Sequence, residues 1–361
     1  MIPGESGRSR DREPAEAEVL AALALRGVSG LGDRRIRREI ESRGSARAAA
    51  ARRGLDTGRH RAHLDEAHRR GLRVVSVGGD GYPVALLDLV DPPPVLFTGP
   101  RPWPDQTRSA AIVGTRRSSS NGNRVSYELA RSLAYRGWTV VSGMAIGIDA
   151  SAHEGSLDVD GDTIGVLGSG HAHEYPHANR ALYARMRCGG LLVSEFPPCE
   201  RPSRATFPRR NRLIAALSRV VIVVEAGERS GALITADHAL DLGREVYAVP
   251  GRVGDAKAVG TLALLRQGAT LVRHADDVLD SLGELYDFAP PPPAARPRPA
   301  TADSLVLDAL GVDELTADQV ADRTELAVSR TVVLLGRLEL EGLVSRRPGG
   351  RFSASGRTAP E

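Results

Sequence analysis

From about residue 110 to residue 249, short runs of β-branched and other apolar residues alternate with longer stretches of helical periodicity. Such alternation is typical of an α/β fold in which a mostly parallel sheet is buried between helices. The predicted strands are Ala111–Val113, Thr139–Val141, Ile164–Leu167, Leu191–Val193, Val220–Val224 and Val246–Val249. Between the first two, Val125, Leu129 and Leu133 recur every four residues, as one buried face of a helix requires. The pattern predicts a Rossmann-like, doubly wound sheet.

A helical pattern precedes this sheet, over residues 16–75. Leucines at helical spacing lie on either side of Gly30-Leu31-Gly32, a glycine-apolar-glycine turn between two predicted helices. We interpret the segment as a SAM-like or helix-hairpin-helix module, whose backbone amides at a helix start could hold a phosphate. A plain packing module is an equally good interpretation. A proline-stiffened stretch then leads into the α/β domain, which we expect over residues 81–288.

Residues 289–301 are rich in proline and lack the amide donors that a helix or sheet needs, so they predict a linker. Beyond it come a leucine-rich helical pattern, a capping box at Thr316 to Gln319 and a third helix near Val328 to Leu340. Two short strands follow. Three helices before a hairpin predict a winged helix over residues 302–355.

Composition excludes several classes of protein. No apolar run approaches the roughly 20 residues of a membrane-spanning helix, and the polar N-terminal residues lack the apolar stretch of a secretory signal. We therefore expect a cytoplasmic protein without a membrane partner. Cys188 and Cys199 are the only cysteines and lack metal-type spacing, so we expect no zinc site and no disulfide framework. The formal net charge of +3 is compatible with a polyanionic ligand but does not indicate one by itself.

Small residues gather where the predicted strands end. Gly114-Thr115-Arg116 follows the first strand, Ser142 to Gly147 follows the second, and Gly168-Ser169-Gly170 follows the third. Ligands of doubly wound sheets bind at the carboxyl ends of the strands, where backbone amides and helix dipoles favour anions. The pattern G-x-G-x-x-G and a Walker A lysine are absent, so no nucleotide cofactor is expected. The turns instead let the backbone approach a phosphate closely.

Arg116 is the strongest single candidate for an anion-binding residue. An arginine in a glycine turn at a strand end can reach a phosphate oxygen with two donors. A structural salt bridge is the alternative interpretation. The sequence leaves both open.

A second cluster of cations lies in Phe207 to Arg212, at the start of a predicted helix. Cations at a helix N-terminus oppose the helix dipole, so a negative partner is expected. That partner is either Glu195 or Glu225 within the protein, or a bound phosphate, and different arginines can have different partners. The polar residues of the cluster are Arg209, Arg210, Asn211 and Arg212.

Other polar residues give weaker signals. Asp149 and His153 lie four apart on a predicted helix and could form an acid-base pair or half of a metal site, but helix stabilisation is favoured because no third ligand follows. Ser230-Gly231 and Thr235 open a helix, and the hydroxyls of Ser230 and Thr235 could cap that helix or contact a ligand, with capping favoured. No catalytic triad, nucleophile elbow or pair of catalytic carboxylates is recognisable, so a hydrolase of the usual kinds is not indicated.

In their order along the chain, the motifs of the central region resemble those of the DprA/Smf family, the DNA-processing proteins of bacterial natural transformation. The resemblance covers roughly Gly81 to Ala275. It rests on Gly114-Thr115-Arg116, on Ser142 to Asp149 with His153, on Tyr175-Pro176 with Asn179, on Ser194-Glu195, on Phe207 to Arg212, on Glu225, on Ser230 to Thr235 and on Pro250-Gly251.

The resemblance implies a non-catalytic protein that binds single-stranded DNA, protects incoming DNA, forms a homodimer through its Rossmann-like domain and loads RecA. The residues expected to bind nucleic acid are Gly114, Thr115, Arg116, Ser142, Gly143, Gly147, Asn179, Arg209, Arg210, Asn211, Arg212, Ser230 and Gly231. The sequence departs from the family pattern at two places in this expected binding pocket. His177 stands where relatives often carry a longer basic side chain, and Val259 and Leu262 replace two polar residues.

The sequence leaves two other functions open. One is a nucleotide-processing, phosphoribohydrolase-like enzyme with Glu225 and Arg209 as actors, although that family's Pro-Gly-Gly signature is missing. The other is a transcriptional regulator that works through the winged helix. Because Arg330 and Arg337 of the candidate recognition helix are balanced by two glutamates, a partner-binding or packing role is favoured for this domain.

Overall fold

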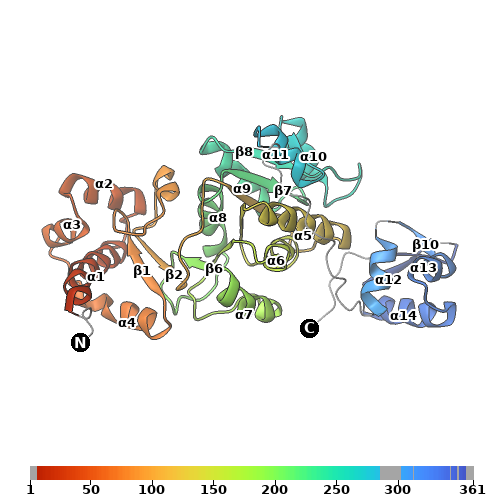
Figure 1. Cartoon of the computed structure of the whole chain (residues 1–361), viewed down its shortest axis with the longest axis horizontal. Coiled ribbons are helices and arrows are strands. Elements are labelled where there is room, and N and C mark those ends of the chain that lie inside the picture. Colours follow the sequence, from red (N-terminus) through yellow and green to blue (C-terminus); the bar gives the residue numbers. More distant parts are fainter. Residues whose placement is uncertain (1–5, 285–301, 312, 342, 348, 355–361) are drawn as a thin grey trace.

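The structure is a computed structural model that describes residues 6–284, 302–311, 313–341, 343–347 and 349–354. The predicted linker at 289–301 lies outside the described residues. A nine-stranded sheet forms the centre, helices of the N-terminal segment lie at one end of it, and the C-terminal elements form a separate small unit (Figure 1). In the described part of the chain, no helix is both long and apolar enough to cross a membrane.

The central sheet confirms the predicted α/β architecture. Its strand order is β1-β2-β6-β5-β4-β3-β7-β8-β9, and every pairing from β6 to β9 is parallel. From β3 the chain adds β4, β5 and β6 on one side, and then β7, β8 and β9 on the other side of β3. The strand order therefore reverses between β3 and β7, which is the switch point of the sheet. The strands are β1 (Arg73–Ser76), β2 (Val95–Thr98), β3 (Ser109–Val113), β4 (Thr139–Ser142), β5 (Thr163–Val166), β6 (Leu191–Ser194), β7 (Val220–Val223), β8 (Glu245–Ala248) and β9 (Thr270–Leu271).

Helices cover both faces of this sheet, because successive strand residues point to opposite sides. Ala111 and Val113 of β3 join one apolar cluster with α8 and α9, whereas Ala110 and Ile112 join the other with α5 and α6. The predicted stripe lies on α5, with Leu129 and Leu133 buried and Val125 packed against them. The helices are α5 (Ser120–Tyr135), α6 (Ile148–Leu157), α7 (Arg180–Gly189), α8 (Thr206–Ala216), α9 (Gly231–Asp241), α10 (Val259–Arg266) and α11 (Ala275–Ser281).

The N-terminal segment is helical, as its periodicity indicated, and joins the sheet at its end. Its helices α1 (Ser6–Arg26), α2 (Asp33–Arg43), α3 (Ala46–Arg52) and α4 (Arg61–Arg69) share a core with β1 and β2. β1 pairs antiparallel with β2, which in turn pairs antiparallel with β6. The helical segment and the α/β domain are therefore connected by one continuous sheet.

The C-terminal unit has the predicted winged-helix order. Thr316 and Gln319 form the expected capping box, in which each side chain accepts a hydrogen bond from the other residue's backbone amide. Val306, Leu335 and Phe352 lie in its core. The elements are α12 (Ala302–Leu310), β10 (Leu315–Thr316), α13 (Ala317–Thr324), α14 (Val328–Leu340), β11 (Val344–Arg347) and β12 (Arg351–Ala354), and the sheet order is β10-β12-β11.

Candidate nucleic-acid interface

A cleft of about 460 Å³ opens over the carboxyl ends of β3 and β7, at the switch point of the sheet. Ligands of open α/β sheets bind at this position because the loops diverge there and leave a crevice. Among the residues expected to bind nucleic acid, those that line the cleft are Thr115, Arg116, Arg210, Asn211, Ser230 and Gly231. A smaller hollow beside it, of about 60 Å³, is lined by Arg116, Arg210 and Gly143 among others.

Arg116 presents its guanidinium to this cleft. The side chain is exposed and lies over the ring of Phe207, with 4.7 Å between the guanidinium carbon and the ring centroid. Among the described residues, no carboxylate lies within 4.0 Å of it, so the salt bridge weighed as the alternative does not form. Its charge acts at longer range on Asp149, where it opposes the rise in pKa that burial causes. The cleft also receives Arg117 and Arg204, two exposed arginines that the sequence motifs did not single out.

Arg210 is buried and serves the framework of the cleft. Its guanidinium donates hydrogen bonds to the backbone carbonyls of Gly143 and Val166, at the ends of β4 and β5. Burial lowers the pKa of Arg210, and the nearby carboxylate of Asp149 opposes that shift. The guanidinium packs so closely that a Cβ atom on residue 143 would lie 2.2 Å from its Nη1 atom. A side chain at position 143 would therefore displace the Arg210 guanidinium from these bonds.

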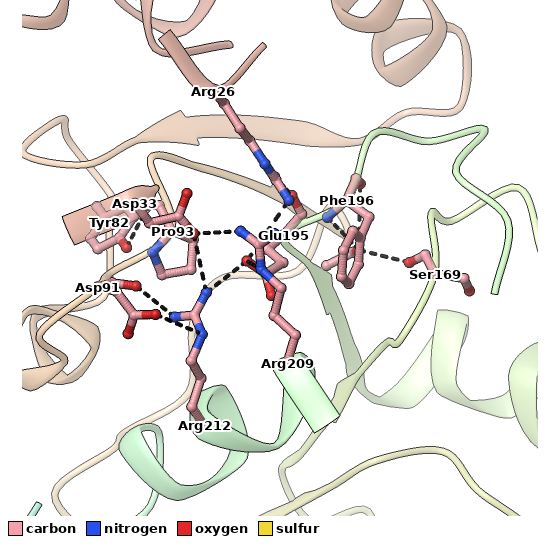
Figure 2. A network of polar contacts seen from close by, with 11 residues as sticks. Arg26, Asp33, Tyr82, Asp91, Pro93, Ser169, Glu195, Phe196, Arg209 and Arg212 are labelled. Carbon is pink, nitrogen blue, oxygen red and sulfur yellow. Dashed lines mark hydrogen bonds and ion pairs between the residues drawn. The ribbon is translucent and has the colours of Figure 1, made fainter. Parts of the chain in front are cut away.

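Arg209 and Arg212 point away from the cleft into an ion-pair network with the N-terminal helices (Figure 2). Glu195, which follows β6 and is fully buried, lies 2.8 Å from Arg212 and 3.3 Å from Arg209. Asp33 at the start of α2 pairs with both arginines, and Arg26 of α1 lies 3.9 Å from Glu195. Of the two internal carboxylates that the sequence offered as partners, Glu195 is the one that pairs with these two arginines. Asp33 pairs with them as well.

Glu225, the other carboxylate considered as a partner for the arginines, lies elsewhere. It follows β7 and accepts hydrogen bonds from the backbone amide and the hydroxyl of Ser119, just before α5. The position suits a carboxylate, because the free amides of a helix N-terminus favour negative charge. Its backbone carbonyl accepts a hydrogen bond of 2.8 Å from the amide of Thr115, which ties the Arg116 turn to β7.

Three further candidate residues use their polar side-chain groups inside the protein. The Ser142 hydroxyl donates to the Ile112 carbonyl, the Asn179 amide to the Met144 carbonyl, and the Asn211 amide to the Gly231 carbonyl, at 2.7, 2.9 and 3.1 Å. The first bond joins β4 to β3, the second reaches the loop after β4, and the third joins α8 to the start of α9. These side chains therefore fix the shape of the cleft.

The remaining candidates are local turn and cap residues. Gly147 has φ of 82°, and a Cβ atom there would lie 2.7 Å from the Ser118 hydroxyl oxygen. Gly114 packs as tightly against Ile148. Ser230 is the N-cap of α9, where its hydroxyl accepts from the Ala232 amide, so the predicted capping role is confirmed.

Asp149 and His153 share α6 but do not form an acid-base pair with each other. The Thr163 hydroxyl donates to the Val140 carbonyl at 2.9 Å, so the hydrogen between Thr163 and His153, 2.7 Å apart, belongs to Nδ1 of the histidine. Nε2 of His153 is buried without a hydrogen-bond partner among the residues that the structure describes, and burial lowers the pKa of His153 to about 3. Within the described ranges, no cluster of His, Cys, Asp or Glu is suited to hold a metal ion.

This buried histidine predicts a loss of stability in acid. Because its pKa is about 3 in the folded protein and about 6.5 when unfolded, the unfolded chain binds more protons between these values. Lowering the pH from about 7 to about 5 should therefore remove about 2 kcal/mol of unfolding free energy through His153 alone. Urea titrations across this range should show a shallower pH dependence for His153→Asn, which can still donate to Thr163, than for the parent. The exposed His68→Asn variant should keep the parent slope; a His153→Asn slope equal to it would contradict the prediction.

Sequence comparison assigns the α/β domain and the C-terminal unit to the same family. The profile described as DNA recombination-mediator protein A matches residues 73–283, and the DprA winged helix domain matches residues 289–350. The putative DNA processing protein DprA of Mycobacterium tuberculosis is 38% identical over 358 residues, which cover 94% of this chain and 91% of that protein.

Two solved structures are also similar. The crystal structure of DNA processing protein A from Streptococcus pneumoniae shares 32% identity with a TM-score of 0.61 and covers 73% of this chain and 96% of its own. DNA processing protein A of Helicobacter pylori, whose single-stranded DNA binding mode has been described, shares 30% identity with a TM-score of 0.50 and covers 56% and 93%. The chain described above belongs to the family of DNA recombination-mediator protein A, also called DprA or Smf, and carries that family's winged helix domain.

Proposed function

We propose that this protein binds single-stranded DNA by its phosphates in the cleft over β3 and β7, and that it does so without catalysing a reaction. The observation that carries the proposal is Arg116, an exposed cation at the switch point with no carboxylate at ion-pair distance among the described residues. Arg117 and Arg204 add positive charge to the same cleft. Contacts of this kind read the backbone and carry little base specificity.

The Helicobacter pylori relative supports single-stranded DNA as the ligand, since the mode in which that protein binds single-stranded DNA has been described. Family membership supports the wider role that we propose, in which a cytoplasmic protein protects incoming strands and loads RecA on them. We also propose a homodimer through the α/β domain. The exposed side chains of Leu240 on α9 and Leu271 on β9 offer apolar surface that a second copy would cover.

The Arg116→Ala variant tests the proposal. Loss of one phosphate contact should weaken binding of a single-stranded oligonucleotide about tenfold and lower the salt dependence of log K by about one. Fluorescence anisotropy at several salt concentrations measures both. Because the side chain is exposed, the thermal midpoint should stay close to that of the parent. Arg266→Ala, which removes an exposed arginine of α10 outside the cleft, is the matched control; equal affinities and slopes for the two variants would refute the role of Arg116.

The phosphoribohydrolase-like alternative is less well supported by the geometry. Its two candidate catalytic residues lie in different sites. Arg209 belongs to the ion-pair network of Glu195, whereas Glu225 lines a separate cavity of about 220 Å³ near Lys257. Release of a free base from nucleoside monophosphates would favour this alternative. The absence of release, together with salt-dependent binding of single strands, would favour the DNA-binding function.

A further inference from the structure

A second cavity, of about 670 Å³, opens between the end of the N-terminal helical segment and α7. Arg70 and Leu72, which follow α4, line it from the N-terminal segment, and Arg180 and Arg187 line it from α7. None of the residues that the sequence motifs assigned to nucleic acid lines this cavity. Tyr175 of the Tyr175-Pro176 motif does line it, together with the neighbouring His177.

The charged residues of this cavity favour an anion. Three arginines, Arg70, Arg180 and Arg187, face one carboxylate, that of Glu174. Glu174 lies 2.6 Å from Arg187 and 3.5 Å from Arg180, whose side chain remains 83% exposed. Arg70 pairs with Glu66, which does not line the cavity. An excess of positive charge thus remains, with Arg180 the most accessible part of it.

The interior of the cavity suits a nucleobase. Leu167, Met186 and Leu192 supply buried apolar surface. His171 donates from Nε2 to the Phe97 carbonyl at 2.9 Å, and burial lowers its pKa to about 4, so the ring is neutral and its Nδ1 is a hydrogen-bond acceptor. The amino groups of adenine, cytosine and guanine are donors that such an acceptor can bind. Apolar surface with a few convergent polar groups is typical of small-molecule and nucleotide pockets.

Aromatic side chains connect this cavity with the cleft. Tyr175 and Tyr183 line both the cavity and the small hollow beside Arg116. The ring of Tyr175, 41% exposed, lies 5.6 Å from that of Phe207, over which Arg116 is placed. Arg116, Phe207 and Tyr175 thus form a stacked series that leads from the cleft to the cavity. Exposed aromatic rings stack on bases of single strands without regard to sequence.

We propose that this cavity binds a second nucleotide of the strand held in the cleft, with the base inside and its phosphate at Arg180. The inference rests on the proposed function. The strand then passes from the cleft over Tyr175 toward the N-terminal helical segment. A free mononucleotide has the same chemical groups as a nucleotide of the strand, and an acidic peptide could also bind the arginines. The experiment below distinguishes these ligands.

The test compares Arg180→Glu with Arg185→Glu, an arginine on the same helix that pairs with Asp158 and does not line the cavity. Affinity is measured by fluorescence anisotropy for single-stranded oligonucleotides of about 4 and about 16 nucleotides, since one binding module typically covers a length in this range. Arg180→Glu should weaken binding of the longer oligonucleotide about tenfold and that of the shorter one less than about twofold, because only the longer strand reaches the cavity. Arg185→Glu should change neither by more than about twofold.

A second measurement does not depend on charge. Photo-crosslinking with 5-iodouracil at each position of the longer oligonucleotide should label peptides that contain Tyr175 or Tyr183, and Arg180→Glu should reduce that labelling. Equal affinities for Arg180→Glu and Arg185→Glu at both lengths would overturn the inference. So would Arg180-dependent binding of thymidine monophosphate or of a poly-glutamate peptide without any dependence on strand length. Failure of the parent to bind the shorter oligonucleotide at all would count instead against the proposed function of the cleft.

Discussion

Replacing Glu195 by alanine is expected to lower the free energy of unfolding by about 3 to 5 kcal/mol, the usual cost of removing one partner of a buried ion pair. The carboxylate is completely buried and pairs with Arg212, itself only 6% exposed, and with Arg209. Without it, the buried guanidinium of Arg212 keeps Asp33 at 3.4 Å and Asp91 at 3.7 Å but loses its closest ionic partner. Urea unfolding followed by circular dichroism measures the change.

Glu41→Ala is the matched control for this variant. Glu41 is an exposed carboxylate that lies 2.7 Å from Arg37 on the same helix, and exposed pairs contribute less than about 1 kcal/mol. Glu195→Gln separates charge from shape, since glutamine keeps the volume and one oxygen acceptor. If Glu195→Ala cost no more than Glu41→Ala, the network would contribute little to holding the N-terminal helices against the α/β domain.

Gly143→Ala is expected to abolish most of the single-stranded DNA binding and to cost about 1 to 3 kcal/mol of stability, as overpacking of a buried site does. The new methyl group would lie 2.2 Å from Nη1 of Arg210, so the guanidinium must leave its place. Its hydrogen bonds to the Gly143 and Val166 carbonyls would then break, and the hollow beside the cleft, at the ends of β4 and β5, would change shape. Anisotropy titrations and thermal melts report the two effects.

Gly231→Ala offers a control at the same cleft. Gly231 is the first residue of α9 and lines the cleft, yet no atom lies within 4 Å of a Cβ atom built there, apart from its chain neighbours and its own helix backbone. Alanine at this position should leave stability close to that of the parent and should lower binding much less than Gly143→Ala does. Comparable losses of binding in both variants would mean that methyl groups anywhere at the strand ends disturb the strand, and that the Arg210 contact has no special role.

The arrangement of the sheet could be predicted because strands that are buried on both faces consist almost entirely of apolar residues. Strands such as β7 are apolar at every position, and the intervening helices show one apolar stripe, so each element carries its own local signal. The glycine turns were predictable because small residues gather in the sequence directly after the predicted strands, and Gly147 has the positive φ that favours glycine. Local chemistry was sufficient in these cases.

The partners of the arginines could not be predicted in the same way. Arg209 pairs with Asp33, which precedes it by 176 residues, and nothing in the sequence around Asp33 marks it as a buried ion-pair residue. The sequence offered Glu195 as one of two internal candidates. Only the fold shows that Glu195 pairs with Arg209 and Arg212, whereas Glu225 accepts hydrogen bonds from Ser119, the N-cap of α5. Arg117 and Arg204 were missed because neither belongs to a motif. Their exposure toward the cleft depends on the packing of distant loops.

The pairing of β1 with β2, and of β2 with β6, has a consequence for how the protein tolerates shortening. A protein that began after residue 76 would leave one edge of β2 as a row of unsatisfied backbone donors and acceptors, a surface that invites intermolecular strand addition and aggregation. It would also uncover the apolar side chains of Val95 and Phe97, which pack against the N-terminal helices. The helical segment thus acts as a protective cover for the open margin of the sheet, so its value to the protein would persist even if it never touched DNA.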